Sequence, residues 1–223
     1  MVAVLGFIAL IVVPVLLKMA VKLIAYGVGR LFLNSLGRQA LDQQPDALEL
    51  KRDGATVWRD AARIESLARP LLNAGFGDCG VYVTDKMPGI RIWFLMKEAD
   101  GVAAFIYEHP KTSPWIELSV RYNDGSTTAL SNLPPTGIDM NPPFFKKITA
   151  DGAVPTDQLY QRILKERSPY GIKNVNRQTV VAEYEQAYMR IMTWQKNKGL
   201  SPEEVAAVVK KWSEKRDASG GGA

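Results

Sequence analysis

The sequence predicts an α+β protein with a single transmembrane helix at its N-terminus and then an antiparallel sheet of about five strands. Three observations support this. Met1–Leu17 contains no charged side chain, the middle of the chain alternates apolar and polar residues, and the flanking segments repeat apolar residues at three- and four-residue spacing. We expect one helix before the sheet and a C-terminal helical region that ends in a helical hairpin.

The apolar N-terminal stretch is long enough to cross a bilayer, because about 20 predominantly apolar residues span the hydrocarbon core. A cleaved signal peptide would carry its positive charges before the apolar run, whereas here they follow it. A helix lying on the membrane surface would need a polar face, which Met1–Leu17 lacks. We therefore interpret residues 1–36 as a signal anchor, that is, a transmembrane helix with an amphipathic juxtamembrane extension.

The charges beside this anchor predict its orientation. Lys18, Lys22, Arg30 and Arg38 follow the apolar run, and the first acidic residue is Asp42. The positive-inside rule places such a basic flank in the cytoplasm. The sequence therefore predicts a single-pass protein of a bacterial-type inner (cytoplasmic) membrane, with its soluble domain cytoplasmic.

The extension beyond Leu17 is a candidate contact surface because it has one apolar and one basic side. Lys18 and Lys22 lie four residues apart and share a helix face. Either they only reach the cytoplasmic lipid headgroups, or their stripe packs on a partner membrane protein or on anionic lipid. The residues predicted to make these contacts are Lys18, Lys22, Leu23, Ile24, Val28, Arg30 and Leu31.

The remainder of the chain fits one ordinary domain. We predict a linker at 37–54, a soluble α+β domain at 55–216, and a flexible tail or expression remnant at 217–223. The single cysteine, Cys79, excludes an intramolecular disulfide and suits a cytoplasmic domain. The net charge of +5 is concentrated in part beside the anchor, so it requires no nucleic-acid partner.

The soluble domain is predicted to begin with a helix from Val57 to Ala74. Strands follow, starting at Val81, with later ones near 90–96, 101–108, 115–122 and 126–131. The connections at Gly101 and Gly125 are hairpin turns of a few residues and cannot contain a crossover helix, so the strands that they join should be antiparallel. We expect helices to cover one face of the sheet and water to reach part of the other.

A proline-rich stretch from Leu133 to Lys147 is predicted to be a loop, because proline cannot donate to a strand ladder. Within it, exposed aromatic residues beside basic ones would suit contact with a partner or a membrane. The alternative is that both phenylalanines fill the core beneath the loop. The residues concerned are Phe144, Phe145, Lys146 and Lys147.

Three helices are predicted after the loop, at 155–167, 177–198 and 202–215. The last begins with a capping box, in which Ser201 precedes a proline and Glu204 lies three residues further on. The last two helices should form the helical hairpin.

No residue is predicted to be catalytic. Glu108 and the single histidine, His109, are neighbours on a strand and should point to opposite faces. Cys79 has no nearby cationic residue in the sequence to activate its thiol. The glycine-rich segment Gly75–Gly80 runs from helix to strand, the reverse of a phosphate-binding loop. No spacing typical of a zinc or calcium site occurs, so we expect no cofactor and no metal.

These observations favour a non-enzymatic accessory or scaffold subunit of a larger membrane protein assembly, with membrane lipid and other integral membrane subunits as partners. One alternative is a membrane-tethered sensor that binds a small ligand or peptide on the sheet face, which a deep pocket with convergent polar groups would favour. The other is an enzyme acting on a lipid-borne substrate, which a perturbed carboxylate in that pocket would favour.

Overall fold

The computed structural model describes residues 41–54, 57–133, 141–201 and 204–205. These residues belong to two compact units. The larger unit contains 47–54, 57–133 and 141–189, and the smaller one contains 41–46, 190–201 and 204–205.

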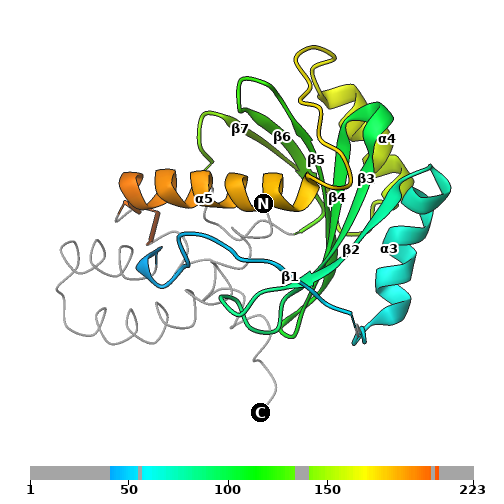
Figure 1. The fold of residues 1–223 in the computed structure, drawn as a ribbon, viewed down its shortest axis with the longest axis horizontal. Coiled ribbons are helices and arrows are strands. Elements are labelled where there is room, and N and C mark those ends of the chain that lie inside the picture. Colours follow the sequence, from blue (N-terminus) through cyan, green and yellow to red (C-terminus); the bar gives the residue numbers. More distant parts are fainter. Residues whose placement is uncertain (1–40, 55–56, 134–140, 202–203, 206–223) are drawn as a thin grey trace, which may run out of the picture. The chain divides into compact units, whose positions relative to one another are not determined.

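A seven-stranded sheet forms the centre of the larger unit (Figure 1). Its strands lie in the order in which they occur in the sequence. Neighbours from β1 to β6 are antiparallel, and β7 runs parallel to β6. The strands are β1 (Lys51–Arg52), β2 (Gly77–Val83), β3 (Arg91–Lys97), β4 (Val102–His109), β5 (Thr112–Arg121), β6 (Thr127–Ser131) and β7 (Phe145–Thr149).

The prediction of about five antiparallel strands is therefore wrong, because the sheet has seven strands and is mixed. The strand β1 lies in the predicted linker, and its two residues are too few to produce an alternating pattern. The strand β7 begins in the segment predicted to be a loop, Leu133–Lys147, and extends two residues beyond it. Residues 132–144 separate β6 from β7, which is enough chain to return to the starting end of β6, as a parallel pair requires.

Three α-helices and one short 3₁₀-helix are described. They are α3 (Ala61–Asn73), η1 (Glu98–Asp100), α4 (Thr156–Glu166) and α5 (Val180–Lys198), of which α5 runs through both units. The helix α3 begins later than predicted, because the side chain of Asp60 caps it by accepting a hydrogen bond from the backbone N–H of Arg63 at 3.0 Å. Val57, the predicted first residue, precedes the helix and is exposed.

The helices α3 and α4 cover one face of the sheet (Figure 1). Their apolar residues recur at helical spacing and meet the alternate apolar residues of the central strands. The main buried contributors are Ile64, Leu67 and Leu71 of α3, Leu159 and Ile163 of α4, and Leu95, Ile106, Ile116, Leu118 and Leu130 of the sheet.

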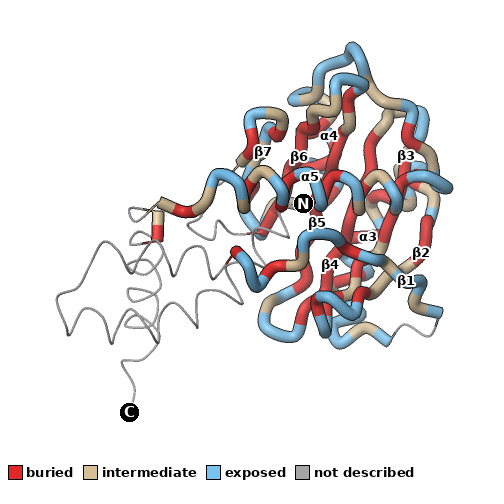
Figure 2. Tube along the Cα trace, turned by 60° about the vertical axis from the view of Figure 1, so that its left-hand side comes forward, coloured by how far each residue is buried: buried red, intermediate tan, exposed pale blue. Residues whose placement is uncertain are grey.

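Aromatic side chains fill the space on the opposite face, where the first half of α5 packs. The ring of Tyr184 lies 5.2 Å from that of Phe94 and 4.9 Å from that of Phe105, between ring centroids. Every residue of β4 is buried as a result (Figure 2). The expectation of a partly water-exposed second face is therefore wrong at this central strand.

In the smaller unit, the capping box predicted for Ser201 and Glu204 is confirmed. The backbone N–H of Glu204 donates to Ser201 Oγ at 3.1 Å, and the N–H of Ser201 donates to the Glu204 carboxylate at 2.8 Å. The rest of the predicted helix at 202–215, and with it the helical hairpin, lies outside the described residues.

The predicted anchor and its extension, residues 1–36, also lie outside the described residues. Among the helices that the structure describes, none combines the length and the apolar character needed to cross a bilayer.

Candidate functional site

Glu108 binds the N-cap residue of α3. It lines a cavity of about 360 Å³ at the end of β4, together with His109 and the residues that precede α3. Its Oε1 accepts a hydrogen bond from the backbone N–H of Asp60 at 2.9 Å, and its Oε2 lies 3.7 Å from Arg91 Nη1. The carboxylate therefore satisfies the N-terminus of α3, where a negative charge is favourable.

His109 lines the same cavity and closes the hairpin turn. The strand register shifts between Tyr107 and His109, so the regular alternation that predicted opposite faces for Glu108 and His109 is interrupted here. Its Nδ1 accepts a hydrogen bond from the backbone N–H of Lys111 at 3.2 Å, so the proton of the neutral ring sits on Nε2. Burial lowers the pKa of His109, and the nearby charges of Lys111 and Arg59 lower it further. At neutral pH the ring is uncharged and forms part of the turn.

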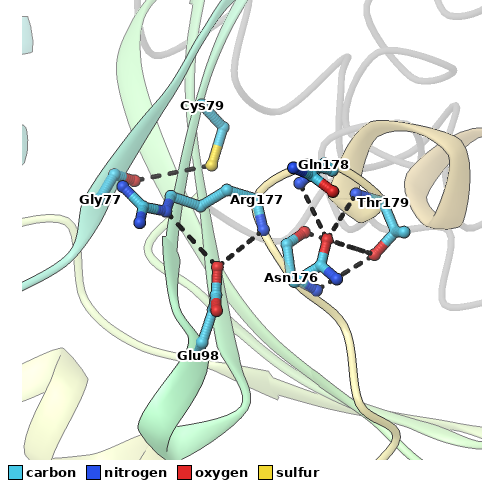
Figure 3. Close-up of polar contacts among 7 residues, drawn as sticks. All are labelled: Gly77, Cys79, Glu98, Asn176, Arg177, Gln178 and Thr179. Carbon is cyan, nitrogen blue, oxygen red and sulfur yellow. Dashed lines mark hydrogen bonds and ion pairs between the residues drawn. The ribbon is translucent and has the colours of Figure 1, made fainter.

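Cys79 is buried in β2 and lies beside Arg177, as Figure 3 shows. Its Sγ donates to the carbonyl of Gly77 at 3.6 Å. Burial raises the pKa of Cys79 to about 11, Asp78 adds to the rise, and Arg177 opposes it only in part. The thiol therefore stays protonated at neutral pH and is a poor nucleophile.

Arg177 could not be recognised from the sequence, because the fold brings it to β2 from the segment just before α5. Its side chain is held by Glu98, whose Oε1 accepts from the Arg177 backbone N–H at 3.0 Å and from Nε at 3.4 Å (Figure 3). Asn176 precedes it and accepts hydrogen bonds from the backbone N–H groups of Gln178 and Thr179. These contacts fix the backbone of the segment Asn176–Thr179, which leads into α5.

The predicted contact residues lie in two places. Lys18, Lys22, Leu23, Ile24, Val28, Arg30 and Leu31 are outside the described residues. The other four form the start of β7 and the residue before it: Phe145 is buried, Phe144 and Lys147 are half-buried, and Lys146 is exposed. Phe145 thus belongs to the core, and Lys146 is the member of the set that lines an open groove.

This groove has a volume of about 690 Å³ and lies between the turn joining β5 to β6 and the segment that follows α4. Lys146 forms part of its wall and donates to Glu166 twice, to the carboxylate at 3.0 Å and to the backbone carbonyl at 3.2 Å. We call it the Tyr170 groove. Its lining residues are Tyr122, Asn123, Asp124, Ser126, Thr128, Lys146, Glu166, Arg167, Ser168, Tyr170 and Gly171.

The loop Ser168–Gly171 forms one rim of the Tyr170 groove and is tied to the sheet at both ends. The backbone N–H of Ser168 donates to the hydroxyl of Tyr122 at 2.9 Å, and the N–H of Asn123 donates to the carbonyl of Gly171 at 2.8 Å. Gly171 has a φ of +70°, a conformation that favours glycine. The loop is therefore held in one conformation rather than left to fluctuate.

Tyr170 stands on this loop with 82% of its surface exposed, the highest exposure among the large apolar residues of the described part of the chain. The hydroxyl of Ser168 bonds to both the N–H and the carbonyl of Tyr170, each at 3.2 Å. The backbone beneath the ring is thus fixed while the ring faces solvent. Exposed tyrosines on a rigid support are enriched in protein interfaces.

Arg167 lies next to this loop with 18% of its side chain exposed. Its Nη1 is buried and has no hydrogen-bond acceptor among the described residues, and its Nη2 lies 3.9 Å from Asp100 Oδ1. Asp100 already binds Lys97 and the hydroxyl of Tyr160. A buried donor without an acceptor costs about 1–3 kcal/mol, so the groove contains an incompletely satisfied cation.

Sequence reasoning missed both Arg167 and Tyr170. The one available signal was the segment Ser168–Gly171, whose proline and glycine mark a helix end, with an aromatic residue between them. That signal predicts a turn and does not show that the turn faces a groove.

The described residues contain no group of three or more His, Cys, Asp or Glu side chains arranged to hold a metal ion. No protein-family model matches this chain, and no curated protein or solved structure is significantly similar to it.

Proposed function

We propose that this chain is a non-enzymatic, single-pass membrane protein that serves as an accessory or scaffold subunit of a larger membrane protein assembly. The apolar N-terminal stretch anchors it in a bacterial-type inner membrane, and the folded domain faces the cytoplasm. Its partners are membrane lipid and other integral membrane subunits.

One observation carries the proposal within the folded domain: Tyr170, the most exposed large apolar side chain in the described part of the chain, stands on a hydrogen-bonded loop beside an open groove. Because the backbone beneath the ring is already held, little backbone entropy is lost on binding, which favours docking of another protein.

The groups that the sequence offers for chemistry have structural roles, which also supports a binding function. Glu108 holds the start of α3, His109 closes a turn, and the thiol of Cys79 is protonated at neutral pH. The sensor alternative placed its ligand on the sheet face. At β4 that face is occupied by the protein's own side chains.

The proposal is tested by purifying the full chain from membranes in a mild detergent and measuring the mass of the purified species by native mass spectrometry. We expect a heavier, multi-protein species rather than the 24.7 kDa chain alone. One matched variant replaces Met1–Leu17 with an unrelated apolar span. A second changes Leu23, Ile24, Val28 and Leu31 to polar residues.

Both variants should remain in the membrane fraction. The first should keep the assembly, because it preserves the anchor, and the second should lose it, because the apolar stripe contacts the partner. Purification of the unchanged chain as a single protein, with no partner in any detergent tested, would contradict the proposed role.

A further inference from the structure

We propose that the Tyr170 groove binds an extended segment of a partner protein that carries a carboxylate next to an apolar side chain. This inference rests on the proposed function, since it names the chemistry by which the folded domain would recognise its partner.

The carboxylate is inferred from Arg167. Its Nη1 has no acceptor among the described residues, and its contact with Asp100, at 3.9 Å, is longer than a hydrogen bond. An Asp or Glu side chain from a partner would accept from the guanidinium in the paired geometry that arginine offers to carboxylates. A rotation of this partly exposed side chain would bring Nη1 to the ligand.

The other charges of the groove support an anionic partner over a cationic one. The carboxylate of Glu166 is already bound by Lys146 at 3.0 Å, and the carboxylate of Asp124 accepts from the backbone N–H of Ser126 at 2.8 Å. Both acidic side chains thus have a donor, whereas Arg167 lacks an acceptor for one nitrogen. Among the buried side-chain nitrogens and oxygens of the groove's lining residues, Arg167 Nη1 is the one without a partner among the described residues, and it is a donor.

The apolar neighbour is inferred from Tyr170. Its ring projects into solvent from a loop whose ends are tied to Tyr122 and Asn123. An aromatic or aliphatic side chain that stacks on the ring would remove apolar surface of both partners from water. An extended segment fits best, because the groove is open and has the turn at Asn123–Ser126 on one side and the Tyr170 loop on the other.

The test uses the full chain in mild detergent and two dye-labelled, capped peptides, Gly-Phe-Glu-Gly and Gly-Phe-Gln-Gly, which differ only in the carboxylate. Binding is followed by fluorescence anisotropy. We expect the glutamate peptide to bind about tenfold more tightly than the glutamine peptide. Arg167→Gln should remove this preference, and Arg167→Lys should retain part of it, because lysine keeps the charge but not the paired geometry.

Tyr170→Ala should weaken the binding of both peptides by the same factor. Lys165→Gln is the matched control, because Lys165 is an exposed cation of α4 that does not line the groove, and it should change neither affinity. Thermal unfolding of each variant separates loss of binding from loss of the fold.

Equal affinity for the two peptides, an unchanged preference in Arg167→Gln, or no binding of the glutamate peptide at millimolar concentration would overturn the inference. Acetate competing as well as the glutamate peptide would also overturn it, because a free anion would then suffice. If neither peptide binds while the full chain still purifies with a partner, only the inference about the Tyr170 groove is wrong. If peptides bind but no assembly is found, the proposed membrane role is the part that fails.

Discussion

The hydroxyl of Tyr107 in β4 donates a hydrogen bond to the hydroxyl of Tyr184 in α5 at 3.3 Å, and both side chains are buried. This bond joins the centre of the sheet to the helix that covers its second face. It also places two titratable groups in the core, because burial raises the pKa of both hydroxyls above the ordinary value of 10.

Tyr184→Phe should lower the free energy of unfolding by about 1–2 kcal/mol, because the Tyr107 hydroxyl loses its acceptor inside the core. The measurement is urea unfolding followed by circular dichroism. Tyr170→Phe is the control, since Tyr170 is exposed, and it should leave the midpoint unchanged. A Tyr184→Phe protein as stable as the parent would show that this bond contributes nothing.

Alkaline pH should destabilise the fold through the same pair. Both tyrosines have a raised pKa in the folded state, so their contribution is complete below pH 10 and declines as pH rises above that ordinary value. Absorbance at the phenolate wavelength should show these two groups ionising only on unfolding. Ionisation of every tyrosine in the still-folded protein would refute this expectation.

Acid should weaken a second network, around Asp100. Burial raises the pKa of this carboxyl, but hydrogen bonds from Tyr160 and Lys97 outweigh it, so the pKa lies below 3.8. The stabilisation is therefore complete above about pH 4 and is lost as pH falls through the lowered value. Asp100→Asn should cost about 1–3 kcal/mol at pH 7 and less at pH 3, as judged by denaturant midpoints. An equal cost at both pH values would rule out the charged network as its cause.

Gly77→Ala should be destabilising by at most about 1 kcal/mol, because a Cβ at Gly77 would lie 2.6 Å from Arg177 Cδ and the exposed arginine side chain would have to move aside. The displaced arginine side chain would also lose its Nε contact with Glu98 Oε1 (Figure 3). The double variant with Arg177→Ala should recover part of the loss, so the two changes should be non-additive in a thermodynamic cycle. Gly54→Ala is the control, since nothing lies within 4 Å of its Cβ position. Strict additivity would exclude the clash.

Cys79 should react slowly with a thiol reagent in the folded protein. Its pKa of about 11 reduces the thiolate fraction at neutral pH roughly a hundredfold relative to an ordinary cysteine, and burial slows access further. The test compares the reaction rate with a disulfide reagent in buffer and in denaturant. Cys79→Ser should abolish the signal and leave association with partners intact. A rate in buffer equal to that in denaturant would contradict the assigned environment.

Alternation identified the strands at the centre of the sheet because both their faces pack regularly. The patterns at Ile90–Met96 and Trp115–Tyr122 correspond to β3 and β5. The two edge strands were missed for different reasons. The strand β1 has only two residues, too few to show an alternating pattern. The strand β7 follows a proline-rich segment and pairs parallel to β6, which requires a long connection back to the start of β6. Period-two patterning reports burial of a strand and says nothing of which distant segment pairs with its edge.

The candidate site could not be predicted for a related reason. The Tyr170 groove combines the turn after β5, the start of β7 and the end of α4, and no single stretch of sequence contains its geometry. Likewise, the proximity of Arg177 to Cys79 arises from the packing of the segment before α5 on the sheet. Lys146 was predicted to be a contact residue, but it was placed on an exposed loop, whereas it lies in the strand β7.

The position of Tyr184 also has a consequence for biosynthesis. Phe94 and Phe105 are translated some eighty to ninety residues before the tyrosine that packs against both. The nascent chain can pair β2 to β6 through short turns as it leaves the ribosome, but this aromatic surface stays uncovered until α5 is synthesised. Truncation before Val180 should therefore yield a polypeptide that binds chaperones or aggregates, although every strand of the sheet is present.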